Sequence, residues 1–384
     1  MTKTETKNGS AAGRIIKRIL LVIAVIAGVL LLAAFAIVLR LKANFTGLER
    51  VDGKGMLYSV EYTGNYYSPL VTLPFKLMKP VKSAGCSCFF AENADGQYLT
   101  GRNYDLAHLD KSGNTTGLNV VLKCSPEGKY RSVGIADAAW FSQLGADYYM
   151  GALDDGDTST LFVSLLPYLC MDGVNEKGLS AAILALDVKE GEHAVYQSRE
   201  GRKQVPLPML MRFMLDSCAT VEEAEKLADE YDAVNIGGGD FHLFVTDASG
   251  KSAVFEWRND TLTVTYTDIV TNFYVSADDA EDCYYGDDLK EKYVPPAENP
   301  RNYRFGYGHG YERFKTIMSA AEEHSEGGKT VMSTQECADT LQAVSQEYTG
   351  ELTSLTQYSA VYNNSEPGVD IWVYPDYSRS YHFE

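Results

Sequence analysis

Residues 85–105 hold the side-chain types that could perform nucleophilic chemistry. Cys86 and Cys88 open an apolar run, an Ala-Asp-Gly turn follows, and Gly-Arg-Asn-Tyr-Asp closes the stretch. This pattern predicts two paired strands, which would place Cys86 opposite the segment from Arg102 to Asp105. A guanidinium beside a thiol favours the thiolate, and a carboxylate can orient a neighbouring amine or proton carrier. The stretch is therefore a candidate site for a cysteine nucleophile.

Taken alone, these residues leave other roles open. A Cys-x-Cys pair is commonly structural, half of a metal site or part of a disulfide, and Arg-Asn-x-Asp also occurs in solvated turns. The chain has seven cysteines, an odd number, so at least one thiol has no partner within the chain. The six histidines show no paired or HExxH spacing, and the glycine run at 237–239 lacks P-loop or Rossmann spacing. We therefore expect no metal and no cofactor.

Short strands rich in β-branched and aromatic residues are predicted to position these side chains. They are expected at residues 98–102, 118–124, 179–185, 241–246, 252–257, 262–266, 269–275, 357–362 and 370–374. Helices are expected at residues 221–231, 311–324 and 334–347, the first and the last with capping boxes. Hairpins dominate and strict β-α-β alternation is absent, which favours antiparallel sheet with helices layered on it.

The candidate site resembles that of the choloylglycine hydrolase family of N-terminal-nucleophile hydrolases. This family contains bile salt hydrolases, penicillin V acylases and related acid amidases. Its pattern begins with Cys followed by Thr or Ser, then an apolar strand, a Gly turn and Gly-Arg-Asn-x-Asp, as is found here between Cys86 and Asp105. The separation of Cys86 from Arg102 fits the family spacing. The resemblance therefore assigns the nucleophile position to Cys86 and not to Cys88.

Further motifs follow in family order, so that the resemblance covers roughly residues 84–380. They are the Asn-Glu-Lys-Gly-Leu turn at Asn175, the hairpin from His242 to Glu256, Thr271 with Asn272, Glu312 with Arg313, and the strand at 356–362. The resemblance implies that Asn272 and the backbone N–H of Ala185 are oxyanion donors and that Arg313 is an active-site arginine. Ala185 stands where bile salt hydrolases carry Asn and penicillin acylases often carry Tyr. Asn175 supports the site from its turn, or is a structural residue.

The resemblance also implies an α+β fold, a four-layer αββα sandwich formed by a catalytic domain of residues 86–384. In this superfamily the nucleophile must become the first residue of its chain, so the bond between Gly85 and Cys86 must be cleaved. The α-amine, with a pKa near 8, then serves as the base. Asp105 would hold this amine, and Arg102 and Arg313 would favour the thiolate.

The expected reaction is hydrolysis of a linear carbon–nitrogen amide bond through a thioester. The substrate would be a small amide of bile-salt, penicillin V or N-acyl amine type. Two alternatives are an acyltransferase on the same scaffold, in which an amine replaces water, and a non-catalytic anchored protein that binds a surface partner. The combination of Cys86, Arg102, Asp105, Asn272 and Arg313 favours the enzyme.

Residues 19–39 form a run of 21 residues without a charge, long enough as a helix to span a bilayer core of about 30 Å. A cleaved signal peptide is the alternative, but it needs a shorter apolar region and a small-residue cleavage site. Five basic residues precede the run and two follow it closely. The positive-inside rule then predicts that residues 1–18 are cytoplasmic and that the rest lies outside, with 40–85 as a connecting segment or propeptide.

Charge is unevenly divided between the two ends of the chain. The whole chain has a formal net charge of −18, and the residues after 44 carry 27 basic against 51 acidic side chains, a net charge of −24. Such a body repels nucleic acid, which is bound mainly through its phosphates. We therefore expect a small-molecule substrate, a membrane and no nucleic acid as partners, and the oligomeric state stays open.

Overall fold

The computed structural model describes residues 8–52, 56–64, 85–109, 115–140, 161–186, 197–234, 240–258, 261–276, 310–347 and 355–384. The helices are α1 (Asn8–Lys42), the 3-10 helix η3 (Leu161–Leu169), α4 (Leu207–Ser217), α5 (Val221–Glu230), α6 (Tyr311–Glu323) and α7 (Thr334–Ala343). The strands are β1 (Phe45–Arg50), β2 (Leu57–Tyr62), β3 (Gly85–Glu92), β4 (Tyr98–Asp105), β5 (His108–Leu109), β6 (Thr115–Thr116), β7 (Asn119–Cys124), β8 (Ser132–Asp137), β9 (Cys170–Asn175), β10 (Ser180–Leu186), β11 (Lys203–Pro206), β12 (Tyr231–Val234), β13 (Asp240–Thr246), β14 (Ser252–Arg258), β15 (Thr261–Tyr266), β16 (Ile269–Val270), β17 (Ser325–Glu326), β18 (Lys329–Thr330), β19 (Thr356–Asn363), β20 (Gly368–Val373) and β21 (Tyr381–Phe383).

Two large sheets form the centre of the body. The nine-stranded sheet has the order β1-β2-β7-β8-β9-β10-β13-β14-β15, and the six-stranded sheet has the order β16-β3-β4-β19-β20-β21. The sheets contact each other through β10 and β3 and through β9 and β19, while α4 and α5 cover the first sheet and α6 and α7 cover the second. The predicted αββα sandwich is therefore confirmed. Strands of the inner layers are buried on both faces, so they lack the alternation of a half-exposed strand.

Local signals placed the helix starts correctly. Thr220 accepts a hydrogen bond from the Glu223 N–H, and Ser333 and Glu336 form a complete capping box at the start of α7. The third predicted helix ends at residue 343 and not at 347. The strand predicted at 269–275 forms strand pairs only at residues 269–270. The backbone that follows is hydrogen-bonded to buried side chains instead.

The connecting segment before Cys86 contributes two strands to the larger sheet. β1 pairs antiparallel with β2, and β2 pairs parallel with β7 in register from Leu57↔Asn119 to Tyr62↔Cys124. The sequence predicts that this segment packs on the body, but it gives no sign of these strands. Their side chains join the core, with Leu57, Val60 and Tyr62 fully buried.

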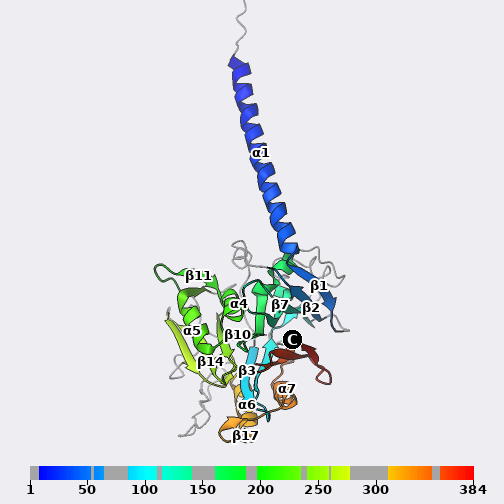
Figure 1. Ribbon diagram of the computed structural model, residues 1–384, viewed down its shortest axis with the longest axis vertical. Helices are drawn as coiled ribbons and strands as arrows, with labels where there is room; N and C mark the ends of the chain where they lie inside the picture. The colour runs from blue at the N-terminus through cyan, green and yellow to red at the C-terminus, as the bar shows by residue number, and fades with distance from the viewer. Residues whose placement is uncertain are drawn as a thin grey trace, which may run out of the picture.

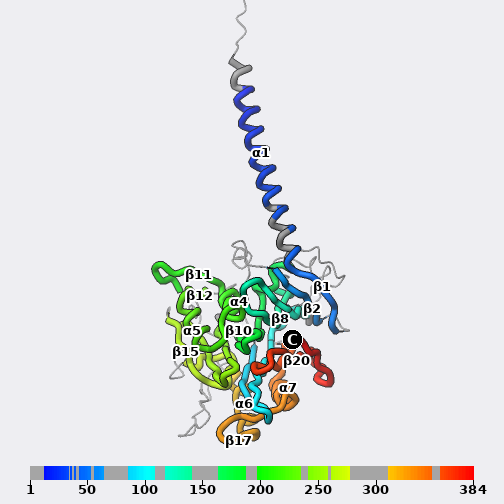
Figure 2. Tube along the Cα trace, viewed as in Figure 1, coloured from blue at the N-terminus to red at the C-terminus, as the bar shows by residue number. Residues whose placement is uncertain are grey.

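The N-terminal helix α1 extends away from the body (Figure 1), and the chain passes from its end directly into β1 and β2 (Figure 2). Its segment Gly13–Ala33 is long and apolar enough to cross a membrane, and none of it is buried. A signal sequence near the N-terminus satisfies the same criteria. The helix therefore agrees with the predicted span at 19–39 without deciding between the two roles.

Candidate active site

Cys86 lies near the start of β3, almost fully buried and directly opposite Tyr104 in β4. Its backbone N–H donates to Asn272 Oδ1 at 2.8 Å, and its carbonyl accepts from Arg313 Nη1 at 2.6 Å. Arg313 Nη2 donates to the same Asn272 oxygen at 2.7 Å. Motifs far apart in the sequence predicted Cys86, Asn272 and Arg313, and the structure places these three residues in direct contact.

Arg313, in the first turn of α6, connects this point to Asp105 at the end of β4. Its Nη1 atom donates to Ser87 Oγ at 2.7 Å and lies 3.6 Å from Asp105 Oδ2. Gln346 Nε2 and Thr356 Oγ1 donate to the Asp105 carboxylate, each at 2.7 Å. Burial raises the pKa of Asp105 above its ordinary value, and Arg313 opposes that rise. The sequence analysis assigned no role in the site to Ser87, Gln346 or Thr356.

Arg102 is fully buried in β4 and lies beside both thiols of β3. Its Nη1 atom is 3.9 Å from Cys88 Sγ, and the cation interacts electrostatically with Cys86 as well. Its Nη2 atom donates to the Ile183 carbonyl at 2.6 Å, and its Nε atom donates to Asp172 Oδ2 at 3.1 Å. Burial raises the pKa of Cys88 to about 12 although Arg102 opposes the rise. Cys88 therefore stays protonated at neutral pH and is a poor nucleophile.

Asp172 in β9 is the counter-ion of Arg102, and sequence reasoning missed it. The hydroxyl of Tyr358 donates to its Oδ2 atom at 2.6 Å, and the hydroxyl of Tyr362 donates to Oδ1. All four side chains are fully buried. Burial raises the pKa of Asp172, and Arg102 is the main opposing influence. The one feature of the sequence that could have indicated Asp172 was its position three residues before the motif that begins at Asn175.

Asn272 links Cys86 to Ala185 in β10. Its Nδ2 atom donates one hydrogen to the Ala185 carbonyl at 2.6 Å. An amide nitrogen carries two hydrogens, so the second can serve another acceptor. The structure therefore brings the two residues expected to stabilise an oxyanion next to each other, and Asn272 also contacts the Cys86 backbone.

Gly310 is a further residue that the sequence did not single out for the site. It precedes α6 with φ +85°, a left-handed conformation that L side chains rarely adopt. A Cβ at this position would lie 2.7 Å from Arg313 Nη2 and 3.0 Å from Thr271 Oγ1. A side chain here would displace the arginine that contacts the Cys86 carbonyl.

Asn175 has its partners within its own turn and the adjacent helix. Its Nδ2 atom donates to the carbonyls of Leu215 and Cys218 at 2.9 and 2.7 Å, and its Oδ1 atom accepts from the Lys177 and Leu179 N–H groups. These contacts fit the structural role. They show no bond from Asn175 to the residues around Cys86.

None of the six cysteines in the described part of the chain forms a disulfide bond. Cys86 is thus a free thiol, as a nucleophile must be. The same part of the chain holds no group of three or more His, Cys, Asp or Glu side chains that could bind a metal ion.

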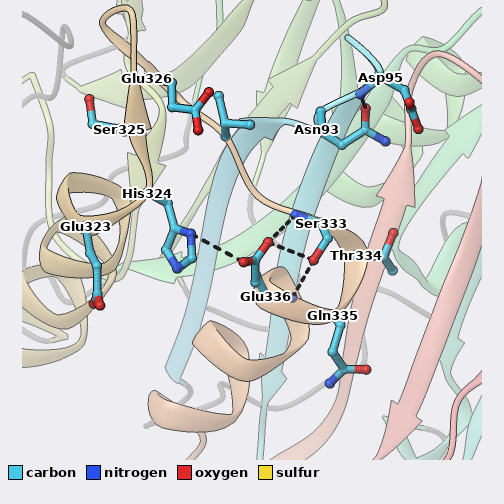
Figure 3. A pocket seen from close by; sticks show the side chains of 12 residues that line it. Asn93, Asp95, Glu323, His324, Ser325, Glu326, Ser333, Thr334, Gln335 and Glu336 are labelled. Atoms are coloured by element: carbon cyan, nitrogen blue, oxygen red, sulfur yellow. Dashed lines mark hydrogen bonds and ion pairs between the residues drawn. The ribbon is translucent and has the colours of Figure 1, made fainter.

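An acidic hollow of about 610 Å³ lies beyond the far end of β3 (Figure 3). Asp95, Glu323 and Glu326 line it, together with the His324–Glu336 ion pair of 3.6 Å. It begins seven residues after Cys86, roughly 23 Å along an extended strand. None of the candidate catalytic residues lines this hollow, so it is distinct from the site.

Comparison with known proteins agrees with this geometry. The sequence model of the linear amide C–N hydrolases, choloylglycine hydrolase family, matches residues 86–274, a segment that begins at Cys86 itself. The resemblance found in the sequence is therefore confirmed. No curated protein matches the chain.

Two solved structures with a TM-score of 0.50 or above share the fold, and a third is reported beside them. A variant of the conjugated bile acid hydrolase from Clostridium perfringens is 17% identical over 78% of this chain and 92% of that chain, with a TM-score of 0.52. A second variant is 18% identical over the same shares, with a TM-score of 0.50. Penicillin V acylase from Agrobacterium tumefaciens is 16% identical over 76% and 84%, with a TM-score of 0.45.

Proposed function

We propose that this member of the choloylglycine hydrolase family, a hydrolase of linear amide C–N bonds, is a membrane-anchored amidase with Cys86 as its N-terminal nucleophile. The observation that carries the proposal is the set of contacts around Cys86. Asn272 and Arg313 hold the backbone on both sides of the thiol-bearing carbon, at 2.8 and 2.6 Å. A buried carboxylate, Asp105, lies 3.6 Å from the same guanidinium.

Maturation would begin with cleavage of the Gly85–Cys86 bond. The Cys86 thiol attacks the Gly85 carbonyl and displaces the Cys86 nitrogen, which takes a proton and becomes an α-amine. Water then hydrolyses the resulting thioester, releasing a carboxylate at Gly85 and restoring the thiol. Asn272 Oδ1, which accepts from the Cys86 N–H before cleavage, is placed to hold the new amine.

The mature enzyme would use this amine as its base. The amine accepts the thiol proton, the thiolate attacks the amide carbon, and the second hydrogen on Asn272 Nδ2 together with the Ala185 N–H stabilises the oxyanion. The α-ammonium returns its proton to the departing amine, which leaves a thioester on Cys86. Water cleaves this thioester to release the acid. Arg102 and Arg313 supply positive charge close to Cys86 during these steps.

The proposed topology follows from the helix α1. Five basic residues before the apolar run favour a cytoplasmic N-terminus and an extracytoplasmic catalytic domain. The segment Gly13–Ala33, none of which is buried, supports a membrane anchor. The substrate would then be a small linear amide that reaches the enzyme outside the cytoplasm, of the bile-salt, penicillin V or N-acyl amine type.

Cleavage would break the covalent link between anchor and enzyme, yet the two pieces would stay together. β2 lies inside the nine-stranded sheet with β1 on one side and β7 on the other. Its side chains Leu57, Tyr58, Val60 and Tyr62 are buried, and each such burial is worth about 1.5–3 kcal/mol. A free fragment would lose this contribution, so we expect the cleaved enzyme to remain at the membrane.

The test uses the full chain in detergent with two cysteine variants. Wild type should yield a fragment whose first residue is Cys86 and should hydrolyse one of three probes, a glycine-conjugated bile salt, a phenoxyacetyl amide or an N-acyl amine. Cys86→Ala should stay at 42.4 kDa and be inactive, whereas the control Cys218→Ala should match wild type. An uncleaved Cys86→Ala protein with wild-type activity would refute the proposal.

Fractionation of cells tests retention separately. The Cys86 fragment should sediment with the membranes together with the anchor fragment, and urea should release it. A fragment found wholly in the medium would contradict retention while leaving the chemistry intact.

A further inference from the structure

His242 and Glu256 form a fully buried pair behind the site, and the proposed chemistry does not use them. His242 lies in β13, and Glu256 lies in the neighbouring strand β14. His242 Nδ1 is 3.1 Å from Glu256 Oε1. Burying two ionisable side chains is costly unless they are paired and hydrogen-bonded, so their remaining contacts indicate what the pair supports.

The pair holds both ends of the segment that carries Asn272. His242 Nε2 lies 2.8 Å from the carbonyl oxygen of Thr271, the residue directly before Asn272. The backbone N–H groups of Val275 and Ser276 donate to Glu256 Oε1 and Oε2, each at 2.9 Å. These bonds replace the strand pairing that ends at residue 270.

The same pair adjoins the strand that carries Ala185. In the β10–β13 register, Leu184 pairs with His242 and Ala185 pairs with Phe241. One histidine therefore touches the Asn272 segment and sits in the strand hydrogen-bonded to β10. Both expected oxyanion donors depend on its position.

The hydrogen-bond partners define where the protons lie. A carbonyl oxygen only accepts, so His242 Nε2 carries a hydrogen. Both Glu256 oxygens accept backbone N–H groups, and His242 Nδ1 lies within hydrogen-bond distance of Oε1. Each of these buried polar atoms therefore has a partner.

We infer that His242 and Glu256 are positioning residues for the amidase reaction, because they fix the Asn272 segment at both ends and align it with Ala185. This inference rests on the proposed function. Asn272 is the residue that contacts the substrate oxyanion, and the pair acts only through it. Loss of the pair should therefore lower kcat and leave KM nearly unchanged, because the oxyanion exists only on the way to the thioester.

Four substitutions test the inference in the full-length protein. Glu256→Gln removes one acceptor, so one of the two N–H groups loses its partner. His242→Leu removes both ring contacts, and His242→Gln keeps a donor for the Thr271 carbonyl. The control is Asp216→Asn, which neutralises a fully buried carboxylate paired with Arg212 at 2.7 Å inside α4.

Activity is measured on whichever of the three probes wild type hydrolyses fastest, per molecule that has a Cys86 N-terminus. Glu256→Gln and His242→Leu should lower kcat about 10- to 100-fold, less than loss of the donor itself. His242→Gln should recover part of that loss, and Asp216→Asn should keep wild-type kcat. Wild-type kcat in Glu256→Gln would overturn the inference.

Amide hydrogen exchange provides a second test of the inference that does not require enzymatic activity. The N–H groups of Val275 and Ser276 should exchange faster in Glu256→Gln than in wild type, and at the wild-type rate in Asp216→Asn. If wild type hydrolyses none of the probes, the proposed substrate classes are wrong, and hydrogen exchange alone tests the role of His242 and Glu256. Unchanged exchange at both positions in Glu256→Gln would then refute the inference that the pair holds this segment.

Discussion

The two central sheets contribute to the site in different ways. The six-stranded sheet supplies Cys86, Arg102 and Asp105 from a single hairpin, whose register places Cys86 opposite Tyr104. The nine-stranded sheet supplies Ala185 from β10, which is linked to Cys86 through the side chain of Asn272. The proposed nucleophile group is thus set by neighbouring strands, whereas the proposed oxyanion group depends on how the two sheets pack.

Two of the polar contacts that join the sheets at this place differ in character. Arg102 of β4 pairs with Asp172 of β9, and Asn272 joins the Cys86 backbone to Ala185. The first contact carries charge in a fully buried setting, so its loss should affect stability most. The second contacts the backbone of the proposed nucleophile, so its loss should affect turnover most.

The largest effect on stability is expected from Asp172→Asn. This change leaves the Arg102 charge buried without its counter-ion and should lower the free energy of unfolding by about 3–5 kcal/mol. Tyr362→Phe removes only one hydrogen bond to the same carboxylate and should cost about 0.5–1.5 kcal/mol. Denaturant unfolding in detergent measures both. Equal costs for the two variants would show that Asp172 does not serve as the counter-ion.

The largest effect on turnover, apart from loss of the nucleophile, is expected from Asn272→Asp. This change keeps an oxygen toward the Cys86 nitrogen but removes the donor for the oxyanion. Its kcat should fall about 10²- to 10³-fold with KM nearly unchanged. The control Asn364→Asp alters a buried amide bonded to Gly178 and Thr246, and it should leave kcat unchanged. A rise in KM with constant kcat would instead make Asn272 a substrate-binding residue.

A smaller effect of a different kind is expected from Asn175→Ala. The change removes four hydrogen bonds of one turn and should cost about 1–3 kcal/mol of stability. Because none of these bonds reaches Cys86, kcat per folded molecule should equal that of wild type. Thermal unfolding and steady-state kinetics on one preparation separate the two quantities. A loss of kcat without a loss of stability would place Asn175 in the site after all.

The smallest expected effect is a pH dependence at Asp105. Burial raises the pKa of this carboxyl above its ordinary value of 3.8, so the folded chain binds the proton more tightly than the unfolded chain. The contribution of Asp105 to stability therefore falls as pH rises from 3.8 to the raised pKa. Asp105→Asn lacks this slope, so its unfolding free energy relative to wild type should increase across that window and then level off. Unfolding at a series of pH values measures the difference, and a decrease would contradict the sign.

Sequence reasoning predicted the parts of the fold that depend on neighbouring residues. The Cys86 hairpin, the helix starts at Thr220 and Ser333, and the apolar helix α1 each follow from strand pairing, capping or composition over a short stretch. It did not predict β1 and β2, because their place beside β7 depends on pairing between segments far apart in the chain.

For the site, the sequence by itself indicated Cys86 as the candidate nucleophile, Arg102 and Asp105 as its hairpin partners, and the resemblance to the choloylglycine hydrolase family. Only the tertiary structure decided that Asp172 balances Arg102 and that His242 and Glu256 hold the Asn272 segment. The physical reason is burial. A charged side chain between two sheets must find partners from whichever strands pack against it, and local sequence patterns carry no record of that packing.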